Sequence, residues 1–227
     1  MTKTAIFIVG VGAPINLYTD YLENLKKHLP QTTLLVLEWW SEDDFGINKL
    51  KSYIGNAEVM LIAHSAGGVI ALEAFANWPR LVKKIIMLDS HFLRTRDILP
   101  KIGRILDTML SKTNLAIQTK VRNAYAPIIE NDLVFDKALT FAIEWAHANF
   151  DQVCRLFNML PPHRALHIGC TNSAYQLLND EDEENLALLW EKFKVDAAFL
   201  PMNHFDLIDY QHADCINQTI AAWLKHI

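Results

Sequence analysis

Apolar positions along the chain form short continuous runs that alternate with helical repeats. The short runs have the length of strands buried on both faces of a sheet, and they cover residues 5–9, 33–37, 58–63, 84–88, 165–168 and 197–200. Between most of them, apolar residues recur every three to four positions, as on one face of a helix. These repeats lie at 17–29, 47–54, 69–76, 186–193 and 216–224. The alternation predicts an α/β protein with a mostly parallel sheet of about six strands, flanked by helices.

One long interval departs from this alternation. Residues 89–164 contain no convincing strand, and their helical patterns lie around 98–110, 115–124 and 133–160. A structureless loop of that length is improbable in a compact domain. We therefore interpret about 91–163 as a helical insertion that forms a lid over the carboxyl ends of the strands. A structural cap or a dimer surface would give the same pattern.

Length and composition favour one globular domain over residues 1–227. The chain has 227 residues, of which 51% are hydrophobic and 21% charged, and this is enough to bury a large core. A formal net charge of -5 gives no overall attraction to nucleic acid. No spacing of cysteines and histidines resembles a zinc site, so neither nucleic acid nor a metal is expected.

The expected compartment is the cytoplasm. The apolar run at 5–9 is too short for a signal peptide, and no run approaches the ~18 residues of a membrane span. Cys154, Cys170 and Cys215 are odd in number and widely spaced. This argues against a disulfide framework and for a reducing environment.

The candidate chemistry starts at Ser65. The pattern Ala63-His64-Ser65-Ala66-Gly67 joins a strand-like run to a helical repeat. It fits the nucleophile elbow, usually written G-x-S-x-G, in which a serine sits on a strained strand-to-helix turn. Ala63 departs from the usual glycine by one methyl group. Short patterns of this kind also arise by chance, so the position between strand and helix carries the argument.

A serine hydroxyl is a weak nucleophile and needs a general base. In hydrolases with this elbow, the acid and then the histidine follow the serine along the chain. Among nine histidines, His204 follows the last predicted strand and directly precedes the final helix, where a loop can reach Ser65. His64 adjoins the serine, but its side chain is expected to point elsewhere. A solvated loop histidine is the alternative for His204, and His212 is the reserve candidate.

Asp89 is the preferred acid. It ends the run 84–88, the next predicted strand after the elbow, and a carboxylate there could orient the imidazole of His204. The acid more often follows the next strand, but no carboxylate appears there until Asp180. Asp180 belongs to the acidic run 180–184, which reads better as a solvated helix start.

These motifs together resemble a known family. The elbow serine, "IIMLDS" before a helical segment and a late "NHF" resemble the thioesterase domains of nonribosomal peptide and polyketide synthases and their stand-alone type II relatives. The resemblance implies the α/β-hydrolase fold, and several such domains hold their triad aspartate where this chain has Asp89. It is strongest over residues 1–92 and near His204, and it is thin across the lid.

An oxyanion hole is also expected, because the tetrahedral intermediate needs donors aimed at its charge. The N–H of Ala66, the residue after the nucleophile, is one expected donor. The resemblance points to Val11 in the loop "VGVGAPIN" for the second, with Gly12 as the alternative. This loop only imitates a dinucleotide fingerprint, because the third glycine would fall at Ile15, and no cofactor is expected.

The predicted activity is hydrolysis of an acyl thioester through an acyl-enzyme, without a cofactor. A carboxylesterase or lipase would use the same triad on an oxygen ester. A catalytically silent binding protein could keep the same fold.

A charge contrast suggests how the substrate arrives. Residues 91–129 hold seven basic and two acidic side chains: Arg94, Arg96, Lys101, Arg104, Lys112, Lys120 and Arg122, against Asp97 and Asp107. This local excess of positive charge could receive an acyl or peptidyl carrier protein or an acyl group on coenzyme A. Nearby apolar positions would shelter the acyl chain, namely Ile98, Ile102, Leu106 and Leu110. A solvated helix face is the alternative.

Overall fold

A computed structural model describes residues 4–90, parts of 137–155, 162–170, 191, 194–202, 204 and 206–225. Its centre is a six-stranded sheet in the order β2-β1-β3-β4-β5-β6. All neighbouring strands are parallel. The strands are β1 (Thr4–Ile8), β2 (Thr33–Leu37), β3 (Val59–His64), β4 (Val82–Leu88), β5 (Ala165–Cys170) and β6 (Asp196–Leu200). The predicted parallel sheet is confirmed, and each strand lies within two residues of its expected bounds.

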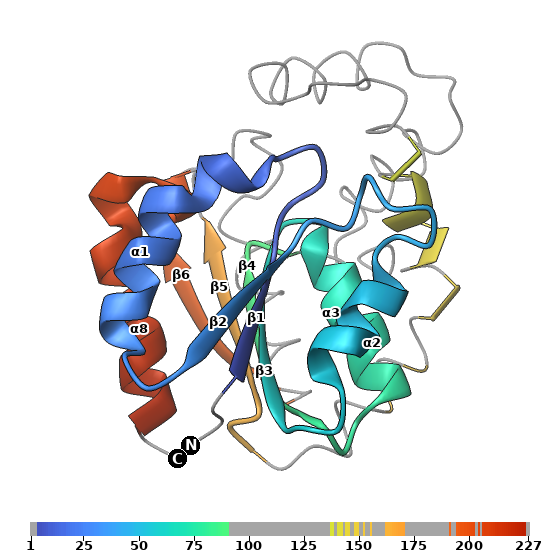
Figure 1. The fold of residues 1–227 in the computed structure, drawn as a ribbon. Helices are drawn as coiled ribbons and strands as arrows, with labels where there is room; N and C mark the ends of the chain where they lie inside the picture. The colour runs from blue at the N-terminus through green and yellow to red at the C-terminus, as the bar shows by residue number, and fades with distance from the viewer. Residues whose placement is uncertain are drawn as a thin grey trace.

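Helices cover both faces of this sheet (Figure 1). Helices α1 (Thr19–His28) and α8 (Tyr210–Lys225) pack against each other on one face. Helices α2 (Ile47–Ile54) and α3 (Gly67–Asn77) lie on the other. The repeat predicted at 17–29 divides into the 3-10 turn η1 (Ile15–Tyr18) and α1, and a second turn, η2 (Asp206–Ile208), precedes α8. The repeat predicted at 186–193 lies outside the described residues, apart from Glu191.

Burial explains why the central strands read as continuous apolar runs. Every residue of β3 and β5 is buried, because helices cover both of their faces. The edge strands β2 and β6 consist largely of half-buried residues. A strand buried on both sides has no polar face to alternate with its apolar one.

The parallel arrangement brings the carboxyl ends of the central strands to the same edge of the sheet. Register pairs His64 at the end of β3 with Leu88 at the end of β4, and Leu88 with Ile168 in β5. Residues that follow these strands therefore emerge at one edge of the sheet. In open α/β sheets, ligands bind outside this carboxyl edge.

Only part of the predicted lid is described. The described residues between 137 and 155 are helical. The ring of Phe141 stacks on Phe45 at a centroid distance of 3.9 Å, and the indole N–H of Trp145 donates a hydrogen bond to the carboxylate of Glu73 on α3. This helical segment thus rests on the β2–α2 connection and on α3. The predicted lid boundaries and the basic stretch at 91–129 lie outside the described residues and stay predictions.

Within the described residues, no helix combines the length and apolar character needed to cross a bilayer.

Candidate active site

Ser65 stands at a sharp turn between β3 and α3. Its backbone has φ 51°, in the left-handed region that non-glycine residues enter rarely and at an energetic cost. Two hydrogen bonds hold the turn to the neighbouring strand. The N–H of Ser65 donates to the carbonyl of Leu88 at 2.9 Å, and the hydroxyl of Ser90 donates to the carbonyl of Ser65 at 2.8 Å. The strained turn is therefore fixed by the end of β4.

Gly67 is required by the close approach of α3 to β1. A Cβ atom at this position would lie 2.6 Å from the carbonyl oxygen of Val9 and 2.7 Å from that of Ile8. Both contacts are with backbone, which cannot rotate away as a side chain can. Ala63, two residues before the serine, is fully buried in β3, so the sheet accommodates a methyl group where the motif usually has glycine.

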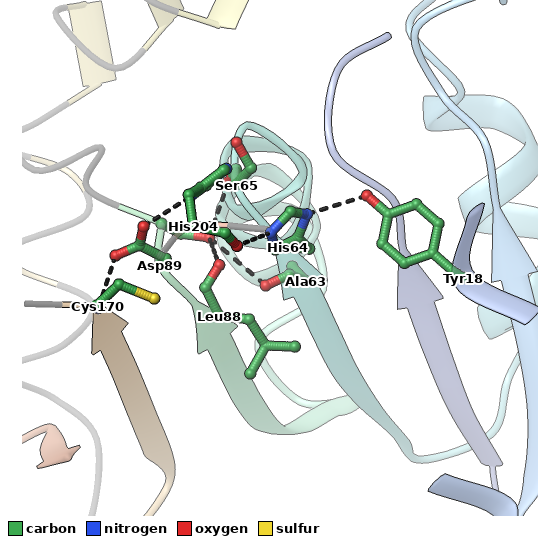
Figure 2. A network of polar contacts seen from close by, with 9 residues as sticks. Tyr18, Ala63, His64, Ser65, Leu88, Asp89, Cys170 and His204 are labelled. Atoms are coloured by element: carbon green, nitrogen blue, oxygen red, sulfur yellow. Dashed lines mark hydrogen bonds and ion pairs between the residues drawn. The ribbon is translucent and has the colours of Figure 1, made fainter. Parts of the chain in front are cut away.

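Asp89 and His204 form a buried pair beside this turn (Figure 2). Nδ1 of His204 lies 2.6 Å from Oδ2 of Asp89, and both residues are only 3% exposed. The other carboxylate oxygen, Oδ1, accepts the N–H of Cys170 at the end of β5, at 3.0 Å. Since a carboxylate only accepts, Nδ1 of His204 carries the hydrogen, and Nε2 is left as the basic nitrogen of the neutral ring.

His204 reaches the turn through His64, the residue before Ser65. The backbone carbonyl oxygen of His204 lies 3.2 Å from Nε2 of His64. The imidazole rings of these two histidines are 4.6 Å apart between centroids. Burial, followed by the charge of His204, lowers the pKa of His64 to about 3. His64 is consequently neutral near pH 7, which suits a position against another imidazole.

The loop after β1 joins the same network. Tyr18 of η1 places its hydroxyl 3.0 Å from Nδ1 of His64 and 2.8 Å from the N–H of Gly10, which donates to it. In the same loop, the N–H of Val9 donates to Leu37 and that of Ala13 to the carbonyl of Gly10.

These bonds bear on which amide of the loop could be the second donor of the expected oxyanion hole. Pro14 has no N–H, and the N–H of Ile15 donates to the carboxylate of Glu38 at 3.3 Å. Among residues 9–15, this leaves the amides of Val11 and Gly12, the two residues expected from the sequence. Gly12 has φ 70°, a conformation that glycine adopts without strain. Ala66, directly after the serine, is the N-cap residue of α3, and its φ and ψ are helical. Among the described residues, no group of three or more His, Cys, Asp or Glu side chains could hold a metal ion.

Ser65, Asp89 and His204 thus meet at one edge of the sheet, as expected from the sequence, and their catalytic roles remain predictions. The reserve histidine His212 lies in α8, and Asp180 lies outside the described residues. Sequence reasoning missed two contributions to this edge, the hydroxyl of Ser90 and the bridging position of His64. The available signals were the serine of "IIMLDS" and the histidine directly before Ser65.

Comparison with known proteins supports the fold that the sequence predicts. No protein-family model and no curated protein matches the sequence. Solved structures do match over nearly the whole chain. One, from a study of carboxylesterases of the thaumarchaeon Nitrososphaera gargenis, has a TM-score of 0.64 at 15% identity, covering 100% of this chain and 92% of its own. The chain has the α/β-hydrolase fold.

Other α/β-hydrolase structures carry different activities. A haloalkane dehalogenase loop variant from Bradyrhizobium elkanii has a TM-score of 0.56 at 12% identity, with 99% of this chain and 89% of its own covered. The thioesterase domain of the curacin biosynthetic pathway has a TM-score of 0.54 at 13% identity, with 100% and 92% covered. Since one fold serves all three activities, the choice among them depends on the residues of the site.

Proposed function

We propose that this chain is a serine hydrolase that cleaves acyl thioesters through an acyl-enzyme intermediate. The observation that carries the proposal is the buried Asp89–His204 pair, joined at 2.6 Å, beside a serine held in a left-handed turn. A serine hydrolase needs a nucleophile on a strained elbow, a base and an orienting carboxylate. These three residue types meet at the carboxyl edge of the sheet.

In the proposed mechanism, the hydroxyl of Ser65 attacks the carbonyl carbon of the thioester while Nε2 of His204 takes its proton. Asp89 stabilises the imidazolium through Nδ1–H. Collapse of the tetrahedral intermediate expels the thiolate, which takes the proton from His204. A water molecule, deprotonated by His204, then attacks the acyl carbon. The bond from that carbon to Oγ of Ser65 breaks, His204 returns the proton to Oγ, and the carboxylic acid leaves.

The negative oxygen of each tetrahedral intermediate requires hydrogen-bond donors that are already in place. We assign this role to the N–H groups of Ala66 and Val11, with Gly12 as the alternative to Val11. Support comes from the chain's own hydrogen bonds, because Gly10 and Ala13 commit their N–H groups within the protein.

The position of the proposed acid favours a thioester over other substrates. The acid follows β4 directly, the position at which several of the thioesterase domains that this sequence resembles hold their aspartate. Thioesterase domains, including that of the curacin pathway, are also among the structural neighbours. An oxygen ester is the second candidate substrate, since a structure from the carboxylesterase study is another neighbour.

Labelling with a fluorophosphonate probe tests the nucleophile. The wild-type protein should react covalently, whereas Ser65→Ala should not, and its turnover should fall on the order of 10³-fold or more. Ser52→Ala is the matched control, because that exposed serine lies on α2 and its hydroxyl bonds to the carbonyl of Lys49. An unreactive wild-type protein would instead identify a silent binding protein.

Matched substrates test the specificity. Thioesters and oxygen esters with the same acyl group should be compared by kcat/KM, with the thioester expected to be the better substrate. A clear preference for the oxygen ester would make the protein a carboxylesterase and leave the roles of Ser65, Asp89 and His204 intact.

A further inference from the structure

The hydrogen bonds around His64 form one continuous chain across the site. They run from the N–H of Gly10 to the Tyr18 hydroxyl at 2.8 Å, from that hydroxyl to Nδ1 of His64 at 3.0 Å, and from Nε2 of His64 to the carbonyl of His204 at 3.2 Å. Figure 2 shows His64 between Tyr18 and His204. Segments far apart in sequence, namely the loop after β1, the end of β3 and the loop after β6, are thereby connected.

The chemistry of the ends fixes the direction of every bond. The carbonyl of His204 can only accept, so Nε2 of His64 carries the hydrogen. In the neutral ring, Nδ1 then has a lone pair and accepts the O–H of Tyr18. The oxygen of Tyr18 in turn accepts the N–H of Gly10. All three bonds are satisfied together in this one arrangement.

We propose that His64 and Tyr18 are positioning residues, which hold the backbone of His204 and the Gly10 end of the loop after β1 in fixed relation to Ser65. This assignment rests on the proposed hydrolase function. Asp89 fixes the imidazole ring of His204, but this side-chain bond does not hold the backbone of the loop after β6. His64 supplies this second attachment from the residue adjacent to the nucleophile.

A neutral His64 suits this role. The His204 ring lies 4.6 Å away and would carry positive charge during each proton transfer. A second positive ring at that distance would oppose the transfer. Burial, with the lowered pKa that accompanies it, keeps His64 uncharged and still able to donate from Nε2.

Two substitutions at His64 separate its two hydrogen bonds. In His64→Gln, the side-chain amide nitrogen can occupy the place of Nε2 and donate to the carbonyl of His204. In His64→Asn, the shorter amide can meet Tyr18 but cannot reach that carbonyl. We expect kcat to fall on the order of 10- to 100-fold in His64→Asn with KM little changed, because an ill-placed base weakens the transition state specifically. His64→Gln should recover most of the loss.

Tyr18 offers a milder test with a close control. Tyr18→Phe removes one hydroxyl from a ring that packs on Phe7, and Tyr21→Phe removes one from the neighbouring buried ring that also packs on Phe7. The hydroxyl of Tyr21 does not take part in the His64 chain. Tyr18→Phe should lower kcat roughly 10-fold, and Tyr21→Phe should keep the wild-type kcat.

The outcomes distinguish this inference from the proposed function. Active sites should be counted by fluorophosphonate labelling, so that kcat refers to folded protein. A wild-type protein that neither reacts nor turns over would overturn both proposals. An active wild-type protein would support the proposed hydrolase function. The positioning role would then be rejected if His64→Asn kept the wild-type kcat, or if His64→Gln lost as much kcat as His64→Asn. If His64→Asn does not fold, equal kcat in Tyr18→Phe and Tyr21→Phe would reject the role.

A spectroscopic measurement adds a readout independent of activity. The ¹⁵N NMR signals of the His64 ring should show a protonated Nε2 and an unprotonated Nδ1 at neutral pH. The opposite tautomer is incompatible with donation to the carbonyl of His204 and would overturn the assignment.

Discussion

Lowering the pH should destabilise this protein through the buried imidazole of His64. Its pKa is about 3 in the folded protein and ~6.5 in an unfolded chain. Below pH ~6.5, His64 therefore binds a proton in the unfolded state but stays unprotonated in the native state. The stabilisation is fully present above that pH and is lost as the pH falls, at about 1.4 kcal/mol per pH unit until the folded pKa is reached. Between pH 7.5 and 5.0 the loss from this group is about 2 kcal/mol.

Urea unfolding at pH 7.5 and 5.0 measures this effect. The free energy of unfolding of the wild-type protein should drop by about 2 kcal/mol more than that of His64→Gln, whose amide does not titrate. Tyr18→Phe is the control, because it disturbs the same hydrogen bonds but retains the imidazole and should keep most of the extra acid loss. An identical pH dependence in the wild type and His64→Gln would refute the reasoning.

Three further substitutions or conditions have definite expected results. Gly67→Ala should lower the free energy of unfolding by at least ~1–3 kcal/mol, because its methyl group would meet two backbone oxygens of the β1 end at 2.6 and 2.7 Å; unchanged urea unfolding would contradict this. Asp89→Asn should reduce kcat on the order of 10³- to 10⁴-fold while Asp180→Asn should not, and the reverse order would move the acid to Asp180. For a carrier-bound thioester, kcat/KM should fall with added salt more steeply than for a short neutral thioester, and the Arg94→Glu/Arg96→Glu variant should lose this difference. Equal salt dependence of both substrates would reject a carrier.

Local patterns were sufficient to predict most of the fold. Continuous apolar runs located all six strands of the described sheet. Burial on both faces leaves β3 and β5 without polar positions, whereas β2 and β6 are apolar runs although they are largely half-buried. The prediction began β4 two residues late because Lys83 and Lys84 interrupt its apolar start; they bond to Glu58 and to the carbonyl of His163. It ended β5 two residues early, at Gly169, which has no side chain to extend the apolar run.

The candidate site was also predictable from the sequence only in part. Ser65 and Asp89 were predictable because each follows a recognisable strand, so their immediate neighbours mark them. The role of His64 was not, because its partners Tyr18 and His204 are 46 and 140 residues away in sequence. No local pattern indicates which distant carbonyl a histidine will contact, so the sequence predicts only that this side chain points elsewhere.

Asp89 and His204 are 115 residues apart in sequence, so the ribosome makes one well before the other. A ribosome making ~5–20 residues per second needs roughly 6–23 s to pass from one to the other. Under the proposed roles, the nascent chain contains its nucleophile and acid throughout that interval, but it lacks the base that would make the serine reactive. Under the proposed mechanism, enzymatic activity would therefore switch on late, when β6 has joined the sheet and His204 has met Asp89. The appearance of turnover during translation would then report completion of the fold.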